Sequence, residues 1–172
     1  MRKAKRILTG ISFFIFPTLF IIGNAFHSDL FSFELHSNVS EWMNEIRMNK
    51  LQQIGNVLEL SAAPFLLIMI FSLINTINEK GKRFALIGGI LALIGCVMLG
   101  VSKGTFCLTT AGFDTLPENE FQQIYPAFEI LFHKTGLLFI TNLLALLPLG
   151  FFIMSIGLIM GKKLPPIQPI LI

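Results

Sequence analysis

The chain has 172 residues, of which 13 are basic and 10 acidic, so its formal net charge is +3 at pH 7. Hydrophobic residues make up 53% of it and charged residues 13%, roughly half of the charged share in soluble domains. This composition excludes a disordered chain, which needs low hydrophobicity and high charge. The apolar residues also gather in four nearly uncharged blocks, which predicts a protein embedded in lipid rather than an ordinary soluble domain.

A helix of about 20 apolar residues crosses the hydrocarbon core of a membrane. The blocks that reach or approach this length are 7–26, 54–77, 84–103 and 135–161. Backbone groups in lipid must satisfy their own hydrogen bonds, so each block is expected to be a helix. The predicted fold class is therefore all-α: an integral membrane four-helix bundle over the single domain 1–172, with two outer amphipathic helical segments, 27–53 and 104–134.

The first block has a second interpretation as a signal peptide. Basic residues precede its apolar run, and Gly23-Asn24-Ala25 has the small-x-small pattern of a cleavage site. The apolar run is long for a signal peptide and has Pro17 in its middle, so a membrane span is the favoured interpretation. Cleavage would leave three spans in unchanged orientation.

Each outer segment carries an amphipathic stretch with helical spacing. Their apolar positions are Val39, Trp42, Met43 and Ile46 in the first, and Phe121, Ile124, Tyr125, Phe128 and Phe132 in the second. Pro126 predicts a kink in the second stretch. Trp42 and Tyr125 are of the types that favour the membrane–water boundary. Both stretches are therefore either interfacial helices over the bundle or a small outer cap with its own core.

Inside the third block, small residues recur every four positions: Gly88, Ala92, Cys96, Gly100 and Gly104. Small residues let membrane helices pack with their backbones close together. We expect this ridge to pack within the chain, with a homo-oligomer or another membrane protein as the alternative partner. Cys107 lies about 16 Å along the helix from Cys96, which is beyond disulfide reach.

Basic residues near the span ends mark the cytoplasmic side. Three basic clusters fall on one side if all four blocks span: Arg2, Lys3, Lys5 and Arg6; Lys80, Lys82 and Arg83; and Lys162 and Lys163. Most acidic residues fall on the other side. We therefore predict a multi-pass protein of a cell membrane, most simply the bacterial cytoplasmic membrane, with both termini in the cytoplasm and lipid as its first partner.

Glu59 is a charged residue inside a predicted span. An acidic side chain is costly in that environment, so we take Glu59 as a candidate functional residue. Lys103, at the outer end of the next span, is an available partner. Asn56 and Asn142 are possible polar neighbours, which makes these four residues our candidates for binding a ligand or an ion. A purely structural Glu59–Lys103 clamp, or a Glu59 side chain that reaches toward water, is the simpler alternative.

Two other patterns are weaker. His27, His36, His133 and Glu129 are residue types that bind zinc, but their spacing matches no metal signature, so no cofactor is expected. Gly100-Val101-Ser102-Lys103-Gly104 matches the hydrolase pattern Gly-x-Ser-x-Gly, which needs a strand-to-helix turn that a membrane helix does not offer. No basic tract able to hold nucleic acid is present.

The fourth block ends with Leu147-Pro148-Leu149-Gly150, Gly157-Leu158 and Lys162-Lys163-Leu164-Pro165. This helix and turn resemble those of bacterial multi-pass membrane proteins of unknown function. The resemblance implies a membrane location and carries over no activity and no functional residue.

The predicted function is that of a small non-catalytic membrane protein with an accessory or regulatory role, binding lipid, an apolar ligand or another membrane protein. The first alternative is an oligomeric transporter or channel component that uses Glu59. The second is a membrane-embedded enzyme with a site on the outer side, built from His133, Glu129 or Ser102.

Overall fold

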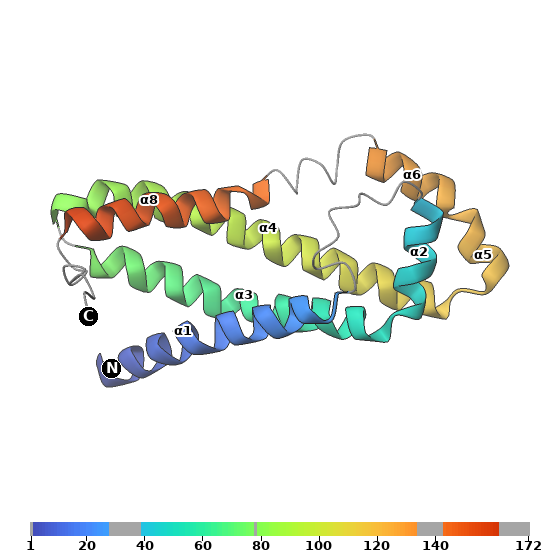
Figure 1. The fold of residues 1–172 in the computed structure, drawn as a ribbon, viewed down its shortest axis with the longest axis horizontal. Helices are drawn as coiled ribbons and strands as arrows, with labels where there is room; N and C mark the ends of the chain where they lie inside the picture. Colours follow the sequence, from blue (N-terminus) through green and yellow to red (C-terminus); the bar gives the residue numbers. More distant parts are fainter. Residues whose placement is uncertain (1, 28–38, 78, 134–142, 162–172) are drawn as a thin grey trace, which may run out of the picture.

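The computed structural model describes residues 2–27, 39–77, 79–133 and 143–161. Over these residues the chain is all-α, as predicted. Its elements are α1 (Arg2–Ala25), α2 (Val39–Met48), α3 (Lys50–Thr76), the short 3-10 helix η1 (Glu79–Gly81), α4 (Lys82–Thr115), α5 (Glu118–Gln123), α6 (Tyr125–His133) and α8 (Leu146–Met160). Four long helices run alongside one another, and α2, α5 and α6 gather at one end of them (Figure 1).

Three of these helices are long and apolar enough to cross a membrane: Arg6–Ala25 in α1, Lys50–Thr76 and Lys82–Thr115. The chain is therefore a helical protein with three candidate spans. The fourth predicted span, 135–161, is described only in part. Its described helix α8 is apolar but has 15 residues, about 22 Å of helix, and residues 134–142 lie outside the described part.

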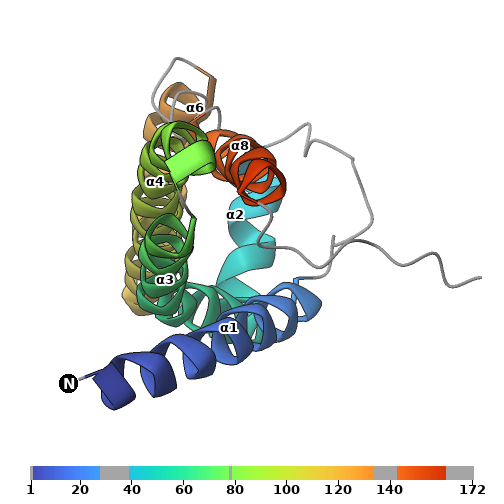
Figure 2. The same ribbon diagram turned by 90° about the vertical axis from the view of Figure 1, so that its left-hand side faces the viewer.

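The long helices pack in chain order. α1 packs against α3, α3 against α4, and α4 against α8. The end view in Figure 2 shows α1 and α8 at the two ends of this row. The short link η1 makes α3 and α4 antiparallel neighbours, as the sequence predicted.

Polar side chains within the long helices bond to their own backbone. Their hydroxyl or amide groups donate to the carbonyl four residues earlier, as in Ser12 to Leu8, Thr18 to Phe14, Asn24 to Phe20, Ser61 to Val57 and Ser155 to Phe151. Such bonds satisfy a polar group without water. These residues therefore fit in an apolar span without defining a polar path through it.

Backbone-close packing joins α4 to α8. A Cβ atom placed on Gly88 would lie 2.5 Å from the carbonyl oxygen of Gly150 and 2.7 Å from the backbone nitrogen of Met154. Only residues without a side chain allow this approach. At the end of the helix pair, Gly157 lies in the same way against the backbone of Gly81.

The predicted ridge does not continue along one face of α4. A Cβ on Gly100 would meet nothing within 4 Å, and one on Gly104 only the tip of Leu60 at 3.9 Å. The reason is geometric: four residues turn a helix by about 400°, so each step of the ridge drifts by about 40°. Gly88 and Ala92 therefore face α8, whereas the Sγ of Cys96 lies 3.6 Å from the carbonyl oxygen of Ala63 in α3.

An apolar core fills the space between α3, α4 and α8. Its buried members are Leu66, Ile70, Ala92, Cys96, Leu99 and Met154. Both cysteines are free, as their predicted separation requires.

The outer end of the molecule is a cap made of α2, α5, α6 and the outer turns of α3 and α4. Met43 of α2, Phe113 of α4 and Phe121 of α5 form its buried core. Arg47 lies over the ring of Phe121 and donates to the Glu118 carboxylate at 2.7 Å. The structure thus favours the second of the two alternatives for the outer stretches, a cap with a core of its own.

Two boundaries of the outer segments differ from the predictions. α4 continues to Thr115, well past the predicted span end at residue 103, because its last turns carry Phe113 into the cap core. The second amphipathic stretch breaks at Ile124, between α5 and α6, which places Pro126 in the first turn of α6. Proline is tolerated there, because the backbone N–H it lacks would have no partner in the helix.

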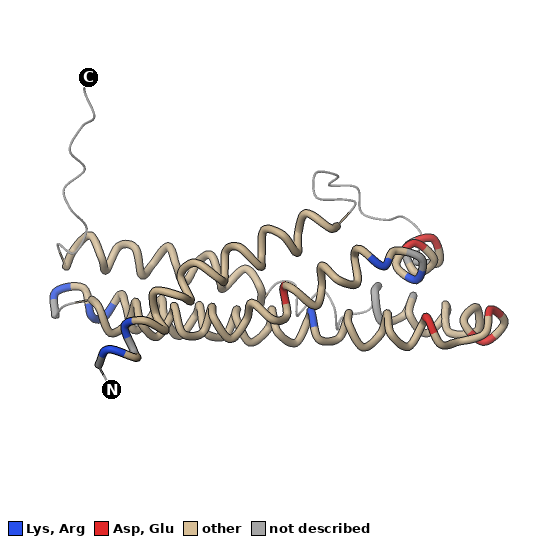
Figure 3. Tube along the Cα trace, turned by 90° about the horizontal axis from the view of Figure 1, so that it is seen from below, with Lys and Arg blue, Asp and Glu red and all other residues tan. Residues whose placement is uncertain are grey.

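Charged residues are distributed unevenly along the long axis. Figure 3 shows basic residues at the end where the chain begins, acidic residues mixed with basic ones at the cap, and charged residues of both signs between the two ends. This distribution agrees with the predicted side for each basic cluster that is described. The orientation in a membrane stays a prediction.

We predict that Gly88→Ala destabilises the protein by about 1–3 kcal/mol, because the added methyl group forces two backbones apart. Gly100→Ala on the same helix is the matched control and should be neutral or stabilising by up to about 1 kcal/mol, since it only gains helix propensity. Unfolding midpoints in detergent measure both. Equal destabilisation by the two variants would contradict the packing described for α4 and α8.

Candidate functional site

Glu59 is buried at the centre of a charged cluster. Its side chain is 1% exposed, and its Oε2 lies 2.5 Å from the Nζ of Lys103. Its Oε1 lies 3.2 Å from the Nε2 of His27. Three segments thus contribute: α3 supplies the acid, α4 supplies the lysine, and the turn that follows α1 supplies the histidine.

A close contact between two helices positions His27. A Cβ on Gly55 of α3 would lie 2.6 Å from the carbonyl oxygen of Gly23 in α1, and one on Gly23 would lie 2.6 Å from the Cγ of Glu59. The end of α1 therefore lies directly on the turn of α3 that carries Glu59. This contact also gives Gly23, in the cleavage-like pattern, a role in helix packing.

Lys103 bridges two residues of α3. Besides Glu59, its Nζ donates to the Oδ1 of Asn56 at 3.3 Å. Asn56 is itself buried, one helical turn from Glu59. We call Glu59, Lys103, His27 and Asn56 the Glu59 cluster.

The Glu59 cluster lies at the level where the membrane boundary is expected. From Phe84 to Lys103, α4 rises by about 30 Å, the thickness of a hydrocarbon core. His27 follows directly after α1, whose apolar span ends at Ala25. The three charged or titratable side chains therefore meet at the outer edge of the apolar region.

A small polar cavity adjoins the cluster. Its volume is about 180 Å³, and its lining residues are His27, Gln52, Asn56, Lys103 and Phe106. The Oε1 of Gln52, the Oε1 of Glu59 and the Nε2 of His27 are buried without an aligned hydrogen-bond partner among the described residues. The Nε2 of His27 and the Oε1 of Glu59 lie 3.2 Å from each other, so the acceptor of this set that lines the cavity is the Oε1 of Gln52.

The sequence-predicted binding residues come together in part. Glu59, Lys103 and Asn56 are in contact, whereas Asn142 lies outside the described residues. The contact is observed, and a binding role for it stays a prediction. His27 was considered only as a metal ligand, and Gln52 was not singled out.

The metal candidates are not assembled in the described part of the chain. His36 lies outside it, and His133 and Glu129 are placed only as backbone of α6. Among the described residues, no group of three or more His, Cys, Asp or Glu residues could hold a metal ion. His27 instead contacts Glu59.

Ser102 of the hydrolase-like pattern lies inside α4, in unbroken helix. The strained turn that exposes a nucleophilic serine in hydrolases is therefore missing at this position.

No protein-family model, curated protein or solved structure matches this chain. The resemblance of the C-terminal helix and turn therefore stays a prediction from the sequence. The Glu59 cluster and the adjoining cavity are the part of the molecule from which a function can be inferred.

We predict that Lys103→Met destabilises the protein by about 3 kcal/mol, because it leaves the buried Glu59 carboxylate without its cation. The double variant Glu59→Gln/Lys103→Met should be more stable than Lys103→Met alone, since the unpaired charge is removed as well. Denaturant unfolding in detergent measures the series, with the exposed Lys82→Met as control. A double variant no more stable than Lys103→Met would show that the charge pair is not what couples these positions.

Proposed function

We propose that this chain is a non-catalytic, multi-pass membrane protein that binds a small polar solute beside the Glu59 cluster. The solute is one that donates hydrogen bonds, such as a polyol or a primary amide. The observation that carries this proposal is the buried Oε1 of Gln52, which has no hydrogen-bond partner among the described residues and belongs to a side chain that lines the cavity.

The chemistry of the cavity favours a neutral donor. Lys103 already balances the charge of Glu59, so an added ion would bring an uncompensated charge into a buried site. The unpartnered oxygen atom of Gln52 needs an N–H or O–H group rather than a further acceptor. Phe106 supplies an apolar wall against which a small carbon skeleton can pack.

A structural clamp accounts for less of this geometry. It explains why Glu59 and Lys103 are paired, but it requires neither a neighbouring cavity nor an unpartnered Gln52. Buried polar groups in proteins are nearly always hydrogen-bonded, to water or a ligand if not to protein. Bound water alone is therefore the outcome against which a solute must be tested.

The transporter alternative has less support. Between the Glu59 cluster and the opposite end of the bundle, the described buried core between α3, α4 and α8 is apolar. The buried Ser12 lies in that half, but its hydroxyl group donates to the carbonyl of Leu8. A binding site beside the Glu59 cluster fits these features better than conduction through one chain.

We further propose that the protein lies in a cell membrane with its basic end in the cytoplasm, as the positive-inside rule predicts. In a chain that carries Cys96→Ser and Cys107→Ser, cysteines introduced at Lys3 and Lys80 should react with an impermeant maleimide only from the cytoplasmic face of vesicles. A cysteine at the exposed Glu120 of the cap should react only from the other face. Labelling of Lys3→Cys and Lys80→Cys from opposite faces would contradict this topology.

Saturation-transfer NMR of the detergent-purified protein tests the binding proposal. The probes are a panel of polyols, primary amides and carboxylates. We expect signals from members of the first two groups, and we expect Gln52→Leu to abolish them because it removes an acceptor from the cavity. Gln123→Leu, an exposed glutamine in the cap, is the matched control. Signals from carboxylates alone, or unchanged signals in Gln52→Leu, would contradict a donor-binding site.

A further inference from the structure

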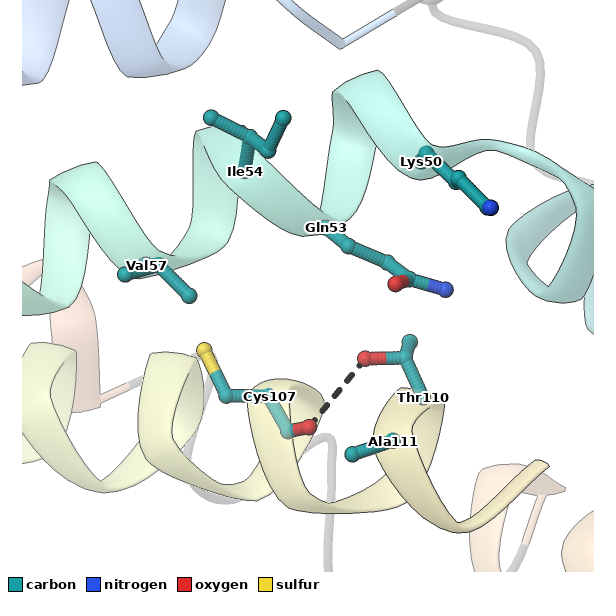
Figure 4. Close-up of a pocket in the computed structure, with 7 residues that line it drawn as sticks. All are labelled: Lys50, Gln53, Ile54, Val57, Cys107, Thr110 and Ala111. Carbon is teal, nitrogen blue, oxygen red and sulfur yellow. Dashed lines mark hydrogen bonds between the residues drawn. The ribbon is translucent and has the colours of Figure 1, made fainter. Parts of the chain in front are cut away.

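A second cavity lies between α3 and α4, outward from the Glu59 cluster. Its volume is about 350 Å³. We call it the α3–α4 groove, and its lining residues are Lys50, Gln53, Ile54, Val57, Cys107, Thr110 and Ala111. In Figure 4 the side chains of Gln53 and Val57 point from α3 toward α4, and Cys107 points back toward Val57.

The polarity of the groove changes along its length. Val57 and Cys107 form its inner end, nearest the Glu59 cluster, and Lys50 lies at its outer end. From Val57 to Lys50, α3 rises by about 10 Å, enough to pass through the headgroup layer of one leaflet, which is about 5–8 Å thick. The hydroxyl of Thr110 is bonded to backbone carbonyls of α4, so it leaves the floor of the groove largely apolar.

Apolar side chains on the outer turns of α3 and α4 are exposed beyond the expected hydrocarbon core, and Ile54 among them lines the groove. Leu108 of α4 is 79% exposed, and Leu51 and Ile54 of α3 are each more than half exposed. Exposed apolar residues that gather in one place mark an interaction site. At this depth, the molecules in contact with the protein are the headgroups and upper acyl chains of lipids.

The rim of the groove carries charges of both signs. The exposed Lys50 lines its outer end, and the amide of Gln53 donates to the Oδ2 of Asp114 at 3.1 Å. A cation and an anion at neighbouring positions complement a headgroup that also bears both signs. A purely anionic headgroup would meet the Asp114 carboxylate without compensation.

We propose that the α3–α4 groove binds one phosphatidylethanolamine molecule of the outer leaflet. The Lys50 ammonium group pairs with the lipid phosphate, and the Asp114 carboxylate accepts from the lipid ammonium group. The first part of an acyl chain covers Val57 and Cys107 at the inner end of the groove and continues toward the hydrocarbon core. None of these residues lines the polar cavity, so lipid binding in the groove can be tested independently of solute binding in the cavity.

Cys107 provides a built-in probe of occupancy. It lines the groove, whereas Cys96 is buried in the apolar core and serves as an internal control in the same molecule. The rate of maleimide labelling at each cysteine is measured by mass spectrometry on the full chain in detergent. We expect added phosphatidylethanolamine to slow labelling of Cys107 and to leave Cys96 unchanged. Unprotected Cys107 at saturating lipid would overturn the proposal.

Two variants and their controls test the assigned contacts. Lys50→Ala should raise the lipid concentration for half-protection about tenfold, because a charge-assisted bond to phosphate is lost. Asp114→Asn should remove the preference for phosphatidylethanolamine over phosphatidylglycerol. The exposed Lys82→Ala and Glu120→Gln, remote from the groove, should change neither property.

Three results would overturn the assignment. Unchanged protection in Lys50→Ala would show that the lysine does not bind the phosphate. Equal protection of the wild-type chain by phosphatidylglycerol would show that the groove does not select the ammonium headgroup. Equal protection by glycerophosphoethanolamine, which has no acyl chains, would show that the ligand is a free phosphate compound and not a lipid.

Discussion

The carboxylate of Glu59 is the constraint on which the arrangement of the helices depends. A charge that is 1% exposed at the edge of an apolar span needs partners, and those partners come from two other segments, at Lys103 and His27. The end of α1 and the middle turns of α3 and α4 must therefore lie at one depth. The Gly23–Gly55 contact makes this possible for α1. The result is one polar layer between an apolar core and an outer cap.

Much of this organisation could be predicted from the sequence because lipid imposes simple rules. Length and hydropathy predicted the apolar segments that form α1, α3 and α4. The Glu59–Lys103 pair was predictable because charges are scarce there and the link through η1 makes their helices neighbours. The contact with His27 was missed, although a signal existed: His27 follows the first span directly, at the depth expected for Glu59.

Other features depend on information that a pattern of residue types does not carry. The ridge in α4 repeats every four residues in the sequence, yet helical drift turns Gly100 away from the neighbour that Gly88 contacts. The amphipathic spacing of the outer stretches was compatible both with a membrane surface and with a cap core, since both bury one apolar face. The α3–α4 groove is built by side chains from two helices, so neither helix predicts it alone.

α4 runs as one helix from the apolar part of the bundle into the outer cap. This continuity fixes both the rotation and the height of the cap relative to the rest of the bundle. Between Lys103 and Phe113 the helix is unbroken, so one inserted residue would turn Phe113 by about 100° and raise it by about 1.5 Å. That turn would take its ring out of contact with Met43 and Phe121 while the Glu59 cluster stayed in place. The number of residues between Lys103 and Phe113 therefore cannot change by even one, although the residue types in this stretch do not require that number.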